Sequence, residues 1–330
     1  MATPIVICDD SNFARKQLAS ALPDGCDVDI TFATDGEEGL AALKENKIDI
    51  MFLDLNMPGL DGYQTLEALK ECGIETKVIV ISGDIQPDAQ ERVKVLGASE
   101  FIKKPVSKED IAQILKKYGV KKSRKKKIKK VNVETDVQAG CQEIANVAMG
   151  RAVDLLSRLL KVYINMPIPN VNTIEKNELL MALKYIDQAD DASAVCQGFI
   201  GAGIAGEALL VFGESSFTDM ADLMGYEEEL DDALQLELLM DVSSILFSAF
   251  LKGLAEQLDI QFCQSQPIVL GRHMKVSDLI SRNEIRWDNT LAIETSFDFE
   301  DREISCDLLF LFTEDSIKPI HQLIEYLLPE

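Results

Sequence analysis

This 330-residue sequence has few of the side chains that most metal and nucleophile sites use. It contains only two histidines, the distant His273 and His321, which argues against a histidine-based catalytic triad or an H-E-x-x-H metal site. Its seven cysteines include no C-x-x-C pair, so we expect neither a zinc site nor a disulfide framework. It also lacks a G-x-x-x-x-G-K-[ST] loop and a dinucleotide fingerprint, so nucleotide-driven chemistry is unsupported.

Basic charge is scarce as well. The net charge of −23 argues against nucleic-acid binding by the surface as a whole, because phosphates would be repelled. The exception is Lys116 to Lys130, which carries ten basic and no acidic residues. We interpret residues 119–131 as a solvated linker between acidic domains, with contact to nucleic acid or an anionic surface as the less favoured alternative. We find no 18-residue apolar segment and no signal peptide, so we expect a cytoplasmic protein without membrane insertion.

Apolar residues make up 47% of the chain, which is enough for the cores of two or three domains. In the first third, short apolar runs alternate with amphipathic stretches at residues 13–22 and 37–45. This alternation is typical of βαβ units and predicts a buried parallel sheet. We therefore assign residues 1–118 to one α/β domain.

Four polar elements stand at the carboxyl ends of predicted strands: the pair Asp9-Asp10, then Asp54, Ser82 and Lys104. Ligands of open α/β sheets bind beyond these strand ends. The three aspartates would converge there, and so much negative charge favours a divalent cation that prefers oxygen, namely Mg²⁺. A single aspartate at a strand end is more often a helix cap or a surface charge, but four elements in register make that interpretation unlikely to hold for all.

With a metal bound, Asp54 can attack a phosphoryl group while the Lys104 ammonium neutralises charge on the phosphoryl oxygens and Ser82 hydrogen-bonds one of them. In order along the chain stand Asp9-Asp10, then Asp54 followed by Asn56-Met57-Pro58-Gly59 and Asp61-Gly62, then Ser82-Gly83 and Lys104-Pro105. In these motifs residues 1–118 resemble the receiver domain of two-component response regulators, with CheY as the small model. The resemblance implies a doubly wound (βα)5 fold and a sensor histidine kinase as phosphodonor. It also implies a cis Lys104-Pro105 bond, and Phe101 as a switch aromatic that works only by packing.

The remaining chain, residues 132–330, begins with a predicted helix from about Glu134 to Tyr163. Its three- and four-residue spacing predicts a core-facing apolar stripe, consisting of Val137, Cys141, Ile144, Ala148, Ala152, Leu155, Leu159 and Tyr163. On one flank, Glu143 and Asn146 point the same way between the small residues Ala139 and Gly150. A carboxylate can engage an ammonium group and a carboxamide can orient water, so this flank is a candidate site.

A related layout recurs further along the chain. Asp241, Ser244 and Pro267 lie 98 residues after Glu143, Asn146 and Pro169, respectively. This shared offset predicts an internal duplication, with repeats at about 134–230 and 232–330.

These features resemble the CheC, CheX and FliY group of phospho-CheY phosphatases. The resemblance implies a pseudo-symmetric α/β domain with two long helices packed on an antiparallel sheet. It makes Glu143 and Asn146 the catalytic pair, although Ala139 stands where the family has Asp or Ser. Asp241 and Ser244 would form a degenerate second site that is weak or silent.

We therefore expect a chemotaxis-type response regulator that is phosphorylated on Asp54. Its C-terminal domain would hydrolyse the aspartyl phosphate of its own receiver or of a separate CheY-like receiver, with Glu143 paired to the Lys104 ammonium and Asn146 holding a water. A homodimer of this chain is a further alternative for how the two domains meet. The alternative is a non-catalytic, phosphorylation-controlled binding module like the scaffolds of the flagellar switch. A transcription factor that uses the lysine run is a distant third, because no DNA-reading helix motif follows it.

Overall fold

The computed structural model describes residues 2–23, 25–120, 137–178, 192–226, 230–270, 289–300, 302, 304 and 306–327. The chain forms two compact units, Met1–Glu143 and Ile144–Leu327. The predicted basic linker lies outside the described residues from position 121 onward, as does His273.

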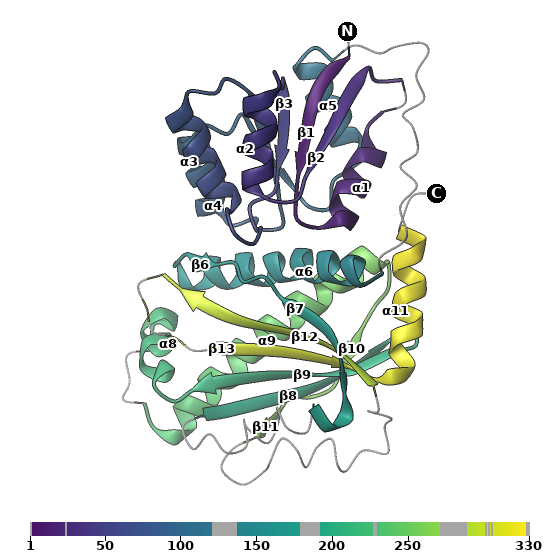
Figure 1. Ribbon diagram of the computed structural model, residues 1–330. Helices are drawn as coiled ribbons and strands as arrows, with labels where there is room; N and C mark the ends of the chain where they lie inside the picture. Colours follow the sequence, from purple (N-terminus) through teal and green to yellow (C-terminus); the bar gives the residue numbers. More distant parts are fainter. Residues whose placement is uncertain are drawn as a thin grey trace. The chain divides into compact units, whose positions relative to one another are not determined.

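The first unit contains a five-stranded, all-parallel sheet with the strand order β2-β1-β3-β4-β5 (Figure 1). Strands and helices alternate along the chain, which confirms the predicted parallel α/β domain. The strands are β1 Thr3–Cys8, β2 Val28–Ala33, β3 Ile50–Leu53, β4 Lys77–Ser82 and β5 Glu100–Lys103. The helices are α1 Asn12–Ala21, α2 Gly36–Glu45, α3 Gly62–Cys72, α4 Pro87–Leu96 and α5 Lys108–Lys117.

The central strands β1, β3 and β4 are buried on both faces, which explains why they are almost wholly apolar. Successive residues of β1 alternate between two hydrophobic clusters: Val6 belongs to one, and Ile5 and Ile7 belong to the other. In β3, Met51 and Leu53 join the first cluster while Phe52 joins the second. The sheet is thereby held rigidly at its carboxyl edge, where the polar residues lie.

Local hydrogen bonds fix where the helices after this edge begin. Ser11 caps α1 by accepting the Ala14 N–H, and Asp61 forms a reciprocal capping box with Gln64 at the start of α3. Gly62 follows, and a Cβ there would lie 2.3 Å from the backbone oxygen of Asp54. Only glycine lets α3 begin this close to Asp54.

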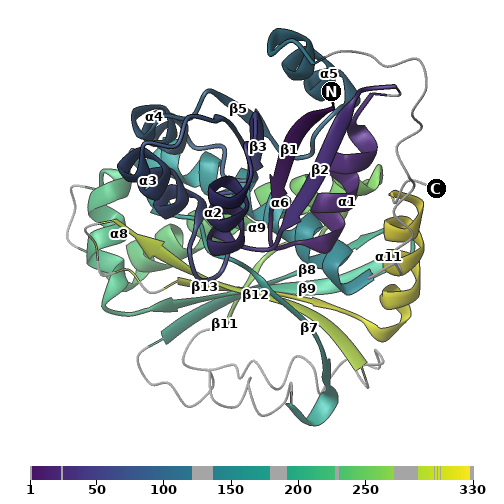
Figure 2. The same cartoon turned by 45° about the horizontal axis from the view of Figure 1, so that its top comes forward.

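The second unit is built on an eight-stranded antiparallel sheet (Figure 2). The strand order is β10-β8-β9-β13-β12-β6, with β11 also paired to β8 and β7 also paired to β12. The strands are β6 Ile164–Asn165, β7 Asn170–Glu175, β8 Ala192–Gly201, β9 Ile204–Gly213, β10 Cys263–Gln264, β11 Ile268–Leu270, β12 Asn289–Phe299 and β13 Cys306–Phe312. The helices are α6 Val137–Leu160, whose first turns belong to the first unit, and α8 Ser216–Met224, α9 Asp232–Leu258 and α11 Glu314–Leu327.

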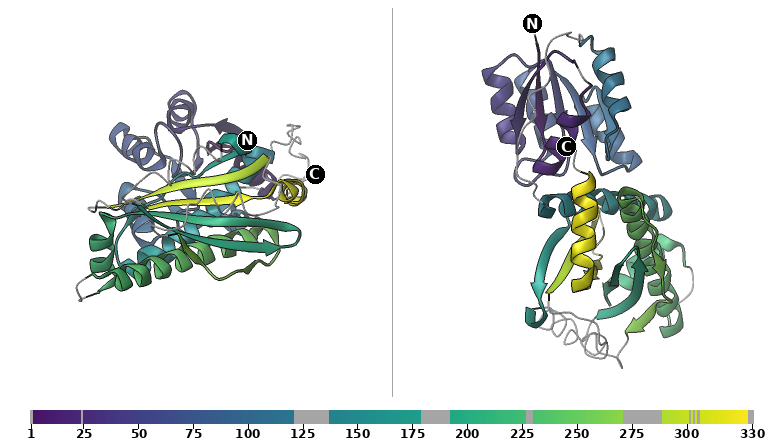
Figure 3. Two further views of the ribbon diagram at one scale, coloured as in Figure 1. Left: turned by 90° about the horizontal axis from the view of Figure 1, so that it is seen from below. Right: turned by 90° about the vertical axis from the view of Figure 1, so that its right-hand side faces the viewer.

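The core of the second unit lies between α9 and the sheet (Figure 3). Phe250 of α9 stacks on Phe310 of β13 with ring centroids 4.1 Å apart. The long helices α6 and α9 also approach closely, since a Cβ on Gly253 would lie 2.7 Å from the Cα of Ala148. Gly253 therefore lets the two helix backbones come into contact.

The predicted first helix needs two corrections. It ends at Leu160 rather than Tyr163, because Lys161 takes a left-handed backbone conformation with φ of 55°. The predicted stripe is also wrong near this end: Leu155 and Leu159 are each 48% exposed, whereas Leu156 and Leu160 are buried. The chosen steps average more than 3.6 residues, so the stripe drifts off the buried side over several turns.

The expectation that no apolar segment of 18 residues exists is also wrong. Among the described residues, α9 alone is long and apolar enough to cross a membrane by length and composition. However, 61% of its most apolar window is buried inside the unit, and Phe247 and Phe250 are fully enclosed. Its apolar residues serve the core, which is why they surround the helix rather than lining one stripe.

Candidate phospho-acceptor site

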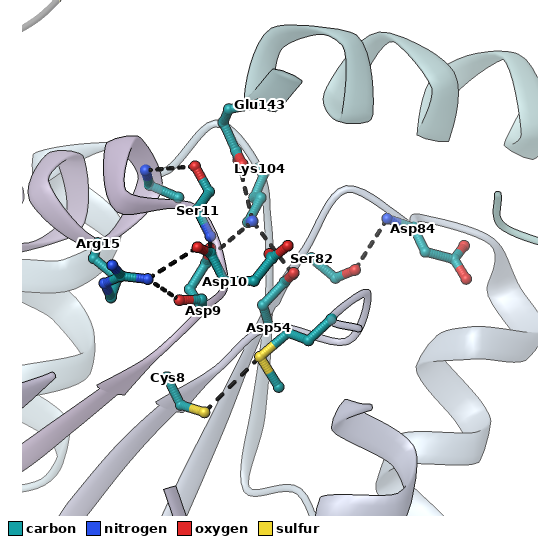
Figure 4. A network of polar contacts seen from close by, with 12 residues as sticks. Cys8, Asp9, Asp10, Ser11, Arg15, Asp54, Ser82, Asp84, Lys104 and Glu143 are labelled. Carbon is teal, nitrogen blue, oxygen red and sulfur yellow. Dashed lines mark hydrogen bonds and ion pairs between the residues drawn. The ribbon is translucent and has the colours of Figure 1, made fainter. Parts of the chain in front are cut away.

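The polar residues singled out in the first domain meet at the carboxyl edge of the parallel sheet (Figure 4). Asp9, Asp54 and Lys104 directly follow β1, β3 and β5, and Ser82 is the last residue of β4. All four side chains are buried. The edge is therefore a shielded, highly charged site in which electrostatic interactions are strong.

Lys104 is the central cation of the site. Its Nζ lies 2.9 Å from Asp9 Oδ2, 3.3 Å from Asp54 Oδ1 and 3.0 Å from Glu143 Oε1. Burial alone would lower the pKa of Lys104, but the surrounding carboxylates, Asp54 foremost, outweigh it and hold the pKa well above its ordinary value. The ammonium is thus permanently charged beside the Asp54 carboxylate.

The N-cap residue of α1 and Arg15 of that helix form hydrogen bonds with the acid pair Asp9-Asp10. Asp9 Oδ1 accepts the Ser11 N–H at 2.9 Å, and the Arg15 guanidinium donates to the backbone carbonyls of both Asp9 and Asp10. The backbone N–H of Asp54 donates to the Cys8 carbonyl at 2.9 Å, which ties β3 to β1 beside the acids. Sequence reasoning missed Arg15, whose only signal is its position one helical turn past the acid pair.

Ser82 and its neighbours complete the edge on the β4 side. The Ser82 hydroxyl oxygen accepts the Asp84 N–H at 3.0 Å, and the Asp84 carboxylate in turn accepts from Gln86 (Figure 4). Phe101 is half-buried and packs against the cluster that includes Val80 and Val93. The peptide bond before Pro105 is cis, as the resemblance implied.

Asp9, Asp10 and Asp54 form the candidate metal site, since one carboxylate oxygen from each lies within 4.8 Å of the others. The pKa of Asp54 is raised to about 8, chiefly by burial, with the Lys104 ammonium opposing this rise and the Asp9 charge adding to it. Burial and the Asp9 charge likewise raise the pKa of Asp10. Excess buried negative charge among oxygen ligands fits a hard divalent cation such as Mg²⁺.

Glu143 is the last residue of the first unit and lies on α6. Its Oε1 contacts Lys104, while its buried Oε2 accepts no hydrogen bond from the described residues. Burial raises the pKa of Glu143, opposed by Lys104 and increased by Asp9. A cavity of about 20 Å³ adjoins these charged groups and is lined mainly by apolar residues, among them Ile7, Leu18 and Phe52.

The other residues singled out on helices lie in the second unit. Asn146 stands three residues after Glu143 on α6, so the two side chains project from the same side of that helix. On α9, Asp241 and Ser244 are exposed, and the Asp241 carboxylate lies 3.4 Å from the Tyr226 hydroxyl that donates to it.

The comparison with known proteins identifies the first unit. Residues 5–116 match the family model of the response regulator receiver domain. Protein PilG of Pseudomonas aeruginosa is 34% identical over 115 residues, a match that covers 34% of this chain and 84% of PilG. The chain belongs to the response regulator receiver family. In this family the acidic pocket generally binds Mg²⁺, and phosphate comes from histidine kinases.

Two other similarities each cover only part of this chain. A protein-glutamate methylesterase/protein-glutamine glutaminase of Geobacter sulfurreducens is 37% identical over 102 residues, which is 31% of this chain. The chain spans only 27% of that relative's length. The structure of Thermotoga maritima FliY is 19% identical, with a TM-score of 0.43 over 59% of this chain and 98% of that chain. A similarity at that level supports no functional argument.

Proposed function

We propose that this response regulator accepts a phosphoryl group on Asp54 and that Glu143 and Asn146 promote hydrolysis of an aspartyl phosphate. The observation that carries the proposal is the 3.0 Å contact between Glu143 Oε1 and Lys104 Nζ, because Lys104 is also 3.3 Å from Asp54. A carboxylate on α6 thus reaches the cation that would hold the phosphoryl group.

The receiver residues divide the chemistry among them. The Asp54 carboxylate attacks phosphorus while the bond between phosphorus and the donor's histidine nitrogen breaks, and the Lys104 ammonium and Ser82 hydroxyl stabilise charge on the phosphoryl oxygens. Mg²⁺ held by Asp9, Asp10 and Asp54 would supply further charge neutralisation. The phosphodonor is a sensor histidine kinase. The cation and hydroxyl are already in position, so little reorganisation is needed during transfer.

Hydrolysis requires a water in line with the bond between phosphorus and the Asp54 oxygen. Glu143 orients α6 through its ion pair with Lys104, and Asn146, one turn further along, presents an amide that can hold the attacking water. Attack breaks the P–O bond, releases inorganic phosphate and regenerates the Asp54 carboxylate. The substrate is this receiver or that of a separate CheY-like protein or second copy.

A duplicated architecture supports the assignment of the second unit to the phosphatase group. The helices α6 and α9 end 98 residues apart, at Leu160 and Leu258, and each is followed by a non-glycine residue with a left-handed backbone, Lys161 and Asp259. Such residues are uncommon, so their recurrence at the offset first seen between Glu143 and Asp241 is informative.

Strand pairing repeats with the same offset. Asn165 of β6 pairs with Asp298, and 98 residues away on each strand Cys263 of β10 pairs with Ile200. Reading the order β10-β8-β9-β13-β12-β6 from either end gives the same sequence of equivalent strands. We infer two halves related by a pseudo-twofold axis between β9 and β13, with one long helix contributed by each.

The second helix favours a different role. At the matching positions of α9 the carboxylate is one methylene shorter and the amide is replaced by the Ser244 hydroxyl, and both side chains are exposed. We propose that this half is silent as a catalyst. The replacement of the Glu and Asn pair on α9 also supports a second candidate function, in which the whole unit is a phosphorylation-controlled binding module.

The deciding experiment is the decay of phospho-Asp54 in the full-length protein with Mg²⁺. We expect Asn146→Ala to slow the decay about 10- to 100-fold, because loss of a water-positioning group removes only part of the rate enhancement. Leu159→Ala shortens a half-exposed side chain on the same helix and should decay like the wild type. Equal decay in all three proteins would leave the binding module as the function.

A further inference from the structure

The guanidinium of Arg15, the fourth residue of α1, binds the loop that carries the acid pair (Figure 4). Its Nη1 donates to the carbonyl oxygen of Asp9 and, at 3.0 Å, to the carbonyl oxygen of Asp10. Within the described part of the chain this guanidinium forms no ion pair. A charged donor, which makes stronger hydrogen bonds than a neutral one, is thus committed to two backbone groups.

These two carbonyls belong to the peptide units on either side of Asp10. Peptide units are planar, so the backbone at one residue is free only in φ and ψ, and the orientations of the two flanking planes fix both angles. Neighbouring hydrogen bonds hold the same segment: the Asp9 N–H donates to the Ala33 carbonyl at 3.2 Å, and the Ser11 N–H donates to Asp9 Oδ1. Arg15 therefore fixes the direction in which the Asp10 side chain leaves the backbone.

Asp10 depends on its backbone more than the other two acids of the candidate metal site do. Lys104 is ion-paired to the Asp9 and Asp54 carboxylates, whereas no ion pair holds Asp10 among the residues that the structure describes. Asp10 is also half-buried, while Asp9 and Asp54 are buried. The position of the third carboxylate of the site is thus set largely by the backbone that Arg15 holds.

We propose that Arg15 is a positioning residue of the metal site and that, by fixing the backbone around Asp10, it favours Mg²⁺ over Ca²⁺. This inference rests on the proposed Mg²⁺ site at Asp9, Asp10 and Asp54. Mg²⁺ requires a nearly ideal octahedron of oxygen ligands at short distances, whereas Ca²⁺ accepts longer and more variable arrangements. A carboxylate with a fixed direction therefore suits Mg²⁺, and its release should weaken Mg²⁺ binding more than Ca²⁺ binding.

The charge and the hydrogen bonds of Arg15 act on the metal site in opposite directions. A guanidinium near a cation site repels the cation, so a substitution that acted through charge alone would tighten Mg²⁺ binding. Loss of the two hydrogen bonds releases Asp10 and weakens binding. We expect the hydrogen bonds to dominate, because Arg15 is half-buried and solvent and salt screen part of its charge.

The test is the dissociation constant of Mg²⁺, and separately that of Ca²⁺, for the full-length protein by isothermal titration calorimetry. We expect Arg15→Met to weaken Mg²⁺ binding about tenfold and Ca²⁺ binding by less than about threefold. Arg15→Lys keeps the charge but lacks the planar fork, so its Mg²⁺ affinity should lie between those of Arg15→Met and the wild type. The control Lys44→Met removes the same charge from an exposed position of α2 and should match the wild type.

A double-mutant cycle shows whether Arg15 acts through Asp10. In an Asp10→Asn background, Arg15→Met should change the Mg²⁺ affinity by less than about twofold, because the carboxylate that Arg15 positions is already gone. A full tenfold loss in that background would contradict the role of Asp10. A general loss of structure would weaken Mg²⁺ and Ca²⁺ binding alike, so an unchanged ratio of the two affinities would also overturn the inference.

The same titrations separate this inference from the metal site on which it rests. If the wild type binds Mg²⁺ and Arg15→Met binds it equally or more tightly, the inference is wrong and the metal site stands. If the wild type binds no Mg²⁺, the proposed metal site is wrong and the inference falls with it. Circular dichroism reports whether Arg15→Met is folded; if it is not, Arg15→Lys decides, and Mg²⁺ affinity equal to that of the wild type overturns the inference.

Discussion

The two units position their proposed functional groups in different ways. In the receiver, residues from four distant segments meet because parallel strands all end at one edge, so each side chain is fixed by the sheet itself. On α6, by contrast, Glu143 and Asn146 lie on one helix flank at the end of the first unit and the start of the second, and their spacing of three residues along the helix places them together. The receiver site therefore requires particular residues in four separate segments, which makes it a specific sequence motif. The helix flank requires only two residues three positions apart, which makes it a weakly specific one.

The largest effect is expected from the receiver's acceptor. Asp54→Asn keeps the shape of the side chain but removes the nucleophilic carboxylate, so incorporation of phosphate from acetyl phosphate should fall at least about 1000-fold. Labelling with radioactive phosphate measures this loss. Asp61→Asn, at the half-buried cap of α3, is the matched control and should label normally. Labelling of Asp54→Asn at the wild-type rate would place the acceptor elsewhere.

A core substitution in the second unit tests whether the receiver acts independently of that core. Phe250→Ala removes the ring that stacks on Phe310 and should lower the free energy of unfolding of this unit by about 3–5 kcal/mol. Denaturant unfolding should then show the loss, while labelling of Asp54 persists. Phe32→Ala, at a ring that is 38% exposed, should change stability little. Loss of Asp54 labelling in Phe250→Ala would show that the receiver does not act independently of this core.

The charge balance of the receiver site predicts a loss of stability when its buried cation is removed. Lys104→Met leaves Asp9 and Asp54 buried without their ammonium partner, which should cost about 3 kcal/mol of unfolding free energy. Mg²⁺ should raise the melting temperature of this variant more than that of the wild type, because the ion replaces the missing cation. Lys103→Met alters an exposed neighbour and serves as the control. An Mg²⁺ effect of equal size in both proteins would contradict the proposed metal site.

The smallest effect concerns the silent half. Asp241→Glu combined with Ser244→Asn installs the α6 pair on α9, at two exposed positions. In an Asn146→Ala background we expect the phosphate of a free CheY-like receiver to decay only about two- to threefold faster, since the surroundings are not preorganised. A return to full wild-type decay would show that the pair alone is sufficient. No change at all would assign α9 to another role.

Sequence patterns predicted the receiver well for a physical reason. Short apolar runs locate the strand ends, and the strand ends locate Asp9, Asp54 and Lys104. The clamp by Arg15 was missed, because a long side chain that reaches two backbone carbonyls leaves no pattern in the sequence. The raised pKa values of Asp10, Asp54 and Glu143 likewise depend on burial that only the fold creates.

In the second unit the sequence predicted the two long helices but misjudged their surfaces. Leu155 and Leu159 were expected in the core and are half exposed, because small errors in period accumulate along 24 residues. The apolar length of α9 was overlooked, since its apolar residues follow no single stripe. The strand order β10-β8-β9-β13-β12-β6 depends on long-range pairing that local patterns do not encode.

The most direct test of the central claim is a double-mutant cycle on the decay of phospho-Asp54, using the wild type, Glu143→Ala, Asn146→Ala and the double variant. If the two residues act as one unit on the aspartyl phosphate, each single variant should decay more slowly, and the double variant should be no more than about twofold slower than Asn146→Ala. If all four proteins lose phosphate at the same rate, the second unit has no part in hydrolysis, and the proposed phosphatase role of Glu143 and Asn146 is wrong.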